Sequence, residues 1–146
     1  MEQQEMTAKI LDGKQIAKDM RAELKEEVAA LAKQGIVPGL GVLLVGDDPA
    51  SRSYVTAKEK ACEKIGVYSD EKRLPVTATK EEILGVVNDY NQDDKIHGIL
   101  VQLPLPDNSM EQAVIDAIAP EKDVDGFHPV SVGRMMLGLP LSLIHI

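Results

Sequence analysis

Apolar and polar residues follow one another along this chain in two different periods, which predict helices and strands. Over 12–34, apolar residues recur every three or four positions between charged ones, as in an amphipathic helix. The apolar stripe of this helix consists of Ile16, Met20, Leu24, Val28 and Leu31. Nearly uninterrupted apolar runs at 40–45 and 96–103 instead predict two buried strands.

The segments between these runs predict further helices and one weaker strand. We expect helices over 51–65, 79–91 and 110–118, and a strand over 67–74. Thr79 and Glu82 have the spacing of a capping box, which marks the start of the second of these helices. Strands separated by helices form parallel sheets with right-handed crossovers. The sequence therefore predicts an α/β fold, a three-layer αβα domain with a parallel sheet.

A parallel sheet binds its ligands beyond the carboxyl ends of its strands. In this sequence that rule indicates the loops after Val45 and Leu103 and the turn Asp123–Gly126. The residues with candidate chemistry lie in or near these same segments.

Composition narrows the class of protein. The chain has 146 residues, 44% of them hydrophobic and 27% charged, which suits one globular domain. Its net charge of -8 disfavours nucleic acid and anionic membranes as partners. The single cysteine, Cys62, suits a reducing compartment. No apolar run is long enough to span a membrane, and the first ten residues lack the apolar core of a secretory signal, so we expect a cytoplasmic location.

Tyr54 and Lys58 are four residues apart and therefore share one face of the predicted helix. A partly desolvated lysine near the positive end of a helix could accept a proton. On spacing alone, a solvated lysine on an exposed face is the more common outcome. Short-chain dehydrogenases also contain Tyr-x-x-x-Lys, but they need a Gly-rich dinucleotide turn that is missing after the strand at 40–45.

Gln102 and a pair of carboxylates are the other candidates. Gln102 ends an apolar strand, where its amide needs a hydrogen-bonding partner: Lys58, a ligand, or a neighbouring loop. Asp123 and Asp125 could bind a cation, accept hydrogen bonds from a heterocycle, or cap their own turn. They lack the further oxygen ligands of a calcium loop, and the histidines lack metal-ligand spacing, so we expect no metal site. Cys62 is more typical of a small buried apolar residue than of a nucleophile.

Three motifs together resemble the bifunctional methylenetetrahydrofolate dehydrogenase/methenyltetrahydrofolate cyclohydrolase family. They are Ser-x-x-Tyr-Val-x-x-Lys with its continuation at 51–66, the stretches 81–91 and 97–106, and Pro-Glu-Lys-Asp-Val-Asp-Gly-Phe-His-Pro at 120–129. The resemblance covers roughly 10–139, in the family's order and spacing. It implies the N-terminal, folate-binding half of a two-domain enzyme.

The resemblance also implies two reactions of one-carbon metabolism that feed purine biosynthesis. Hydride passes from 5,10-methylenetetrahydrofolate to NADP, and the methenyl product is hydrolysed to 10-formyltetrahydrofolate. Carried onto this sequence, Lys58 would be the general acid/base, and Gln102 would hold it by a hydrogen bond. Tyr54 would stack on the aminobenzoyl ring, Asp125 would anchor the pterin, and Ser51 would line the same pocket.

The sequence departs from the family's pattern in two places. Ser131 stands where the family usually has asparagine, and the residues after Pro140 do not match. We therefore expect a catalytic domain over 1–140, a truncated or non-native tail over 141–146, and no NAD(P)-binding domain in this chain. The resemblance implies a homodimer formed largely through that missing domain. It also implies a C-terminal helix that packs on the N-terminal domain and that this chain lacks, so we expect exposed apolar surface along the sheet's edge or one face, with lowered stability or self-association. A folate-binding module without turnover and a merely similar α/β domain are the alternatives.

Overall fold

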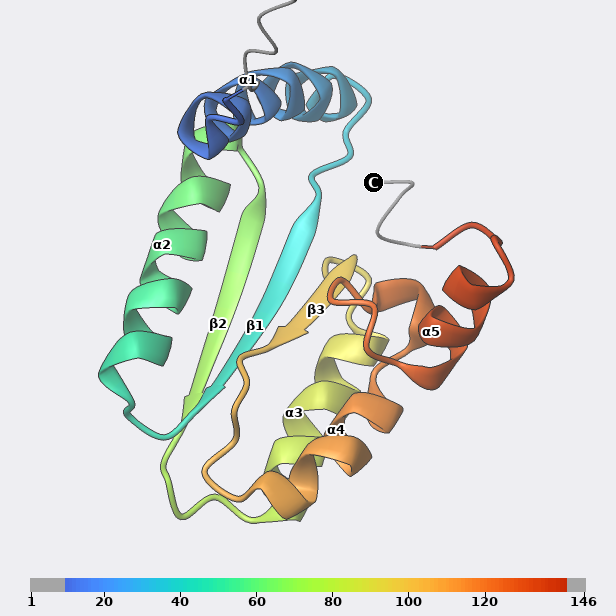
Figure 1. Ribbon diagram of the computed structural model, residues 1–146. Coiled ribbons are helices and arrows are strands. Elements are labelled where there is room, and N and C mark those ends of the chain that lie inside the picture. The colour runs from blue at the N-terminus through green and yellow to red at the C-terminus, as the bar shows by residue number, and fades with distance from the viewer. Residues whose placement is uncertain (1–9, 142–146) are drawn as a thin grey trace, which may run out of the picture.

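A three-stranded parallel sheet lies at the centre of the chain (Figure 1). The structure is a computed structural model, and it describes residues 10–141. The strands are β1 (Gly39–Val45), β2 (Tyr68–Leu74) and β3 (Gly98–Val101), in the order β2-β1-β3. Both pairings are parallel, which confirms the predicted α/β class.

Helices cover both faces of the sheet. They are α1 (Gly13–Ala32), α2 (Pro49–Ile65), α3 (Lys80–Gln92), α4 (Glu111–Ala117) and α5 (Pro129–Met136), with 3-10 turns η1 (Asn108–Met110) and η2 (Pro120–Lys122). The capping box of α3 is confirmed, because Thr79 and Glu82 each accept the other's backbone N–H. Helix α5 was not predicted from the sequence, although Pro129 in its first turn is a typical start signal.

The central strand β1 is buried on both faces. Leu43 and Val45 pack with side chains of α3 and α4, whereas Val42 and Leu44 pack with Val55 of α2. Alternate residues of a strand point to opposite faces, so one apolar run supplies both cores. This two-sided burial explains why 40–45 carries no alternating polar residues.

Strand β3 is shorter than the predicted run 96–103, but its hydrogen bonding to β1 extends beyond both of its ends. The His97 N–H donates to the Gly39 carbonyl at 2.8 Å, and the Gln102 N–H donates to the Leu43 carbonyl at 2.9 Å. The backbone of Gln102 is thus fixed to β1 directly after the strand ends.

Tyr90 ties the end of α3 to the sheet. Its hydroxyl donates to the Asp70 carbonyl of β2 at 2.9 Å, and burial raises the pKa of this phenol. Its ring lies where a side chain at position 41 would be, because a Cβ built on Gly41 would lie 2.9 Å from the ring. Gly41 is therefore required by close packing between β1 and α3.

Most of the exposed large apolar side chains lie on α1, on α5 or in the residues next to these two helices. We had expected such surface along the sheet instead. Only Val28 of the predicted α1 stripe is buried, and Ile16 and Met20 are 47% and 56% exposed. The reason is that α1 packs on the end of α2 through its second half, where Val28 lies beside Gly66, and Ile16 and Met20 belong to its first half. Of the predicted tail 141–146, Leu141 is buried, and 142–146 lie outside the described residues. Within 10–141, no helix is long and apolar enough to cross a membrane.

Two glycine substitutions test this packing. Gly41→Ala should lower the free energy of unfolding by about 1–3 kcal/mol, because the new methyl overlaps the Tyr90 ring. Gly85→Ala, in the middle of α3 with nothing within 4 Å of its Cβ position, should instead raise it by about 1 kcal/mol. Urea titration measures both, and an unchanged midpoint for Gly41→Ala would contradict the packing argument.

Candidate functional site

Lys58 and Gln102 meet at the carboxyl end of the sheet. Lys58 lies on α2, and its Nζ donates to Gln102 Oε1 at 3.2 Å. Gln102 Nε2 donates in turn to the Leu103 carbonyl at 2.8 Å, which fixes the orientation of the amide. Of the three partners that the sequence left open for Gln102, the structure contains two, Lys58 and its own loop.

The side chains around Lys58 on α2 range from buried ones against the sheet to an exposed one at the edge of the helix face. Ser51 and Val55 are buried against the sheet, and Lys58 is half-buried in line with them. Tyr54 lies at the edge of this face and is 63% exposed. An exposed ring beside a half-buried amine is free to contact a ligand.

Lys58 does not lie at the positive end of α2, contrary to the prediction from the sequence. Lys58 lies nine residues after Pro49, the first residue of α2, which is about 2.5 turns into the helix. The helix dipole acts mainly within the first turn, so its positive end does not act on this amine. Asp48 instead occupies that end, where its carboxylate accepts the Ser51 N–H at 2.8 Å. Lys58 instead bonds to Gln102 and interacts with the charge of Asp125.

The two carboxylates of the turn after η2 have different environments. Asp123 is 2% exposed and accepts the Gly126 and His128 N–H groups, both at 3.0 Å. It therefore caps its own turn, as one of the sequence alternatives proposed. Asp125 is exposed at the outside of that turn. A parallel bridge between Asp123 and Ile99 directs the chain alongside β3 toward Gln102.

Asp125 lies close enough to Lys58 for their charges to interact. Partial desolvation of the carboxyl raises the pKa of Asp125, the Lys58 ammonium opposes that rise, and Asp123 adds to it. The desolvation outweighs the attraction by Lys58, although the residue as a whole remains exposed. Asp125 is thus a partly dehydrated hydrogen-bond acceptor beside an amine.

The remaining candidates from the sequence, Cys62, His97 and His128, are buried or bonded to backbone groups. Cys62 is buried, and burial raises the pKa of its thiol, so a reactive thiolate is disfavoured. His97 Nδ1 accepts the Gly39 N–H at 3.0 Å, and His128 Nδ1 accepts the Val130 N–H at 3.1 Å at the start of α5. Among residues 10–141, no group of three or more histidine, cysteine or acidic side chains could hold a metal ion.

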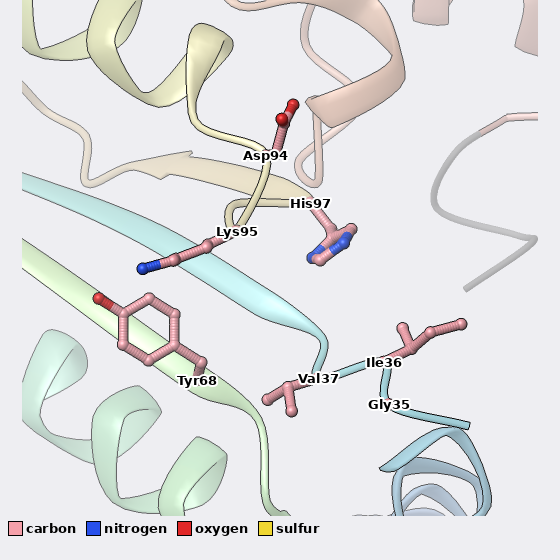
Figure 2. Close-up of a pocket in the computed structure, with 7 residues that line it drawn as sticks. All are labelled: Gly35, Ile36, Val37, Tyr68, Asp94, Lys95 and His97. Carbon is pink, nitrogen blue, oxygen red and sulfur yellow. The ribbon is translucent and has the colours of Figure 1, made fainter. Parts of the chain in front are cut away.

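The candidate site has little enclosed space beside the turn that carries Asp123 and Asp125. Asp123 and Asp125 line a space of about 10 Å³, which is room for one water at most. A cavity of about 580 Å³ lies at the amino ends of the strands, where Tyr68 and His97 line it (Figure 2). Two features set this cavity apart from the candidate site. Its lysine, Lys95, has no glutamine among the other lining residues, and parallel sheets bind their ligands at the carboxyl ends of the strands. A ligand of the candidate site would lie across its open surface.

The chain is similar to known proteins over most of its length. The sequence model of the tetrahydrofolate dehydrogenase/cyclohydrolase catalytic domain matches residues 11–125. The chain belongs to this family. The stretch it covers includes Ser51, Tyr54, Lys58, Gln102 and Asp125.

Relatives match over nearly the whole chain. The bifunctional protein FolD of Geotalea daltonii is 58% identical over 134 residues, which are 92% of this chain and 48% of that protein. The crystal structure of the Campylobacter jejuni FolD enzyme superposes with a TM-score of 0.85 at 48% identity, covering 88% of this chain and 45% of that one. The Trypanosoma brucei enzyme, solved with NADP cofactor and inhibitor, gives 0.84 at 38% identity, covering 88% and 44%. This chain therefore spans about half the length of its relatives.

The raised pKa of Asp125 predicts how stability depends on pH. A carboxyl whose folded pKa is above its unfolded value costs stability as the pH rises through the folded pKa. Asp125→Asn should therefore unfold at higher urea than the parent at pH 7. The difference should shrink as the pH falls toward the unfolded value of about 3.9. Asp94→Asn, in the exposed loop before β3, is the control and should show no such gain; a less stable Asp125→Asn at pH 7 would contradict the desolvation argument.

Proposed function

We propose that this chain binds a reduced folate and hydrolyses 5,10-methenyltetrahydrofolate to 10-formyltetrahydrofolate. The observation that carries the proposal is the hydrogen bond from Lys58 to Gln102, with Asp125 close by, at the carboxyl end of a parallel sheet. Membership of the tetrahydrofolate dehydrogenase/cyclohydrolase family supports the substrate class. We assign the reaction to cytoplasmic one-carbon metabolism that supplies purine biosynthesis.

Lys58 acts as the general acid/base in this proposal. Water adds to the methenyl carbon, a C–O bond forms, and a proton is lost to Lys58. The bond between that carbon and N5 then breaks while Lys58 returns that proton to N5. The hydroxyl proton is released to solvent as the C=O bond forms, which leaves a formyl group on N10. Gln102 can only direct this amine, because an amide neither takes up nor releases a proton near neutral pH, and its Nε2 bond to the Leu103 carbonyl fixes its orientation. Positioned proton transfer of this kind contributes typically about 10²–10⁴-fold to a rate.

Three further side chains hold the substrate. Asp125 accepts hydrogen bonds from the N–H groups of the pterin, and its partial desolvation makes that acceptor less tied to water. Tyr54 stacks on the aminobenzoyl ring, for which its exposed position suits it. Ser51 lines the base of the same face of α2. Together they bring the methenyl carbon to the Lys58 amine.

We assign the dehydrogenase reaction, with NADP as the hydride acceptor, to a protein of the relatives' full length. Those relatives are about twice as long as this chain. The described residues do not fit a dinucleotide. The turn after β1 carries Asp47 and Asp48, and the Asp48 carboxylate already takes the Ser51 N–H that a pyrophosphate would need. Two acidic residues there would also repel the phosphates. The Trypanosoma brucei relative is described with bound NADP, which supports this cofactor for the family.

Lysine substitutions on α2 test the proposed hydrolysis. Lys58→Ala should lower the rate of methenyltetrahydrofolate hydrolysis by about 10²-fold or more, because it removes the acid/base group. Lys60→Ala is the matched control, since Lys60 is exposed on the same helix and lies on another face. The decay of methenyltetrahydrofolate absorbance measures the rate.

Calorimetry with tetrahydrofolate separates turnover from binding alone. Tyr54→Ala and Asp125→Asn should each weaken binding, whereas Lys60→Ala should not. Equal hydrolysis rates for the parent and Lys58→Ala, with folate binding intact, would contradict the catalytic role of Lys58. The chain would then be a folate-binding module without turnover. Absence of folate binding in the parent would refute the proposed function.

We also propose that the chain self-associates through its exposed apolar helices. Met20 of α1 and Met136 of α5 are 56% and 79% exposed, and such side chains favour burial in an interface. Met20→Glu with Met136→Glu should shift sedimentation velocity profiles toward the monomer. A parent that is already monomeric at all concentrations would contradict this proposal.

A further inference from the structure

The end of α3 is joined to the turn that carries Asp125. Lys122, the last residue of η2, reaches across to α3, where its Nζ donates to the Tyr90, Asn91 and Asp93 carbonyls. The three distances are 3.0, 2.9 and 3.0 Å. The last carbonyls of a helix have no partner within the helix, and a cation there also meets the negative end of the helix dipole. One ammonium thus satisfies three acceptors at a single helix end.

Asn91 makes a second connection between the same two elements. Its Nδ2 donates to the Ala117 carbonyl at 2.7 Å, and its Oδ1 accepts the Ala119 N–H at 2.9 Å. Both partners lie between the end of α4 and the start of η2. The segment that enters the turn is therefore bonded to α3 through both the Nδ2 and the Oδ1 of Asn91.

The end of α3 is itself a fixed reference point. Tyr90 fills the space beside Gly41 and bonds to β2, so this end of the helix cannot shift relative to β1 without opening the core. Gln102, the partner of Lys58, is bonded to β1 as well. Both halves of the candidate site are thus positioned from the same strand, one through Gln102 and the other through α3.

We propose that Lys122 is a positioning residue that sets where Asp125 stands relative to Lys58. Lys122 precedes Asp123, whose carboxylate folds the turn by accepting the Gly126 and His128 N–H groups. In sequence, Asp125 lies between the residues that these bonds join. Without the ammonium, the turn loses its attachment to α3 on one side, and Asp125 moves away from the pterin it anchors. The inference rests on the proposed folate site for its ligand, but not for its geometry.

A pair of ligands separates positioning from general stabilisation. Tetrahydrofolate contains the pterin that Asp125 would bind, whereas 4-aminobenzoylglutamate contains only the part assigned to Tyr54. Lys122→Met, which keeps the aliphatic stem, should weaken tetrahydrofolate binding by about tenfold or more and leave 4-aminobenzoylglutamate binding within about twofold. Lys122→Arg keeps a cation that can reach the carbonyls and should restore most of the lost affinity.

Lys80→Met is the matched control, because Lys80 is exposed at the opposite end of α3. It should bind both ligands like the parent. Calorimetry measures the affinities at a temperature where circular dichroism shows each variant to be folded. Equal losses for both ligands in Lys122→Met, or unchanged tetrahydrofolate binding, would overturn the proposal.

Amide hydrogen exchange tests the same proposal without any ligand. In Lys122→Met the Gly126 and His128 amides, which bond to Asp123, should exchange faster by about tenfold while the amides of β1 stay protected. Lys80→Met should leave both sets unchanged. Unaltered exchange at Gly126 and His128 in Lys122→Met would refute the role of Lys122 even if the parent failed to bind folate. Failure of folate binding in the parent with the predicted exchange pattern would instead refute only the proposed function.

Discussion

Burial of β1 on both faces is the constraint on which the rest of this structure depends. A strand without a solvent-facing side must pair all of its backbone groups with neighbouring strands, and its side chains must be apolar in both directions. The order β2-β1-β3 satisfies the first demand, and α2 and α3 on opposite faces satisfy the second. Polar side chains can then enter this region only where the strands end, which is where Gln102 meets Lys58.

The site combines charges with neutral hydrogen-bonding groups. Lys58 faces an amide oxygen at 3.2 Å and interacts at longer range with the Asp125 carboxylate. A carboxylate bonded directly to the amine would hold it firmly as an ammonium, whereas an amide oxygen accepts a hydrogen bond from either form. The neutral partner therefore suits the proton transfer that we propose for Lys58. Asp125 does not bond to the amine and is available for the hydrogen bonds that we propose with the pterin.

Much of the fold could be predicted from the sequence, because the strands and capped helices leave local patterns. The capping box at Thr79 and Glu82 and the apolar run of β1 are examples. The second half of the α1 stripe packs as its period predicts, but Met20 does not, because periodicity cannot tell where the covering element ends. The spacing of Lys58 alone indicated a solvated lysine. The family motif at 51–66 and the bond to Gln102 distinguish it from other lysines of the chain.

The parts of the site that the sequence could not predict are those bonded to main chain. Asp123 and Asp125 are identical in type and two residues apart, and only burial distinguishes the one that caps the turn. Lys122 bonds to carbonyl oxygens, which every residue has, so no side-chain pattern marks its partners. Yet these bonds connect the turn to α3, and Tyr90 connects α3 to β1. On the proposed role of Lys122, the position of Asp125 relative to Lys58 thus depends on contacts to backbone carbonyls of α3. The side chain of Asp125 itself remains exposed at the surface where a substrate would bind.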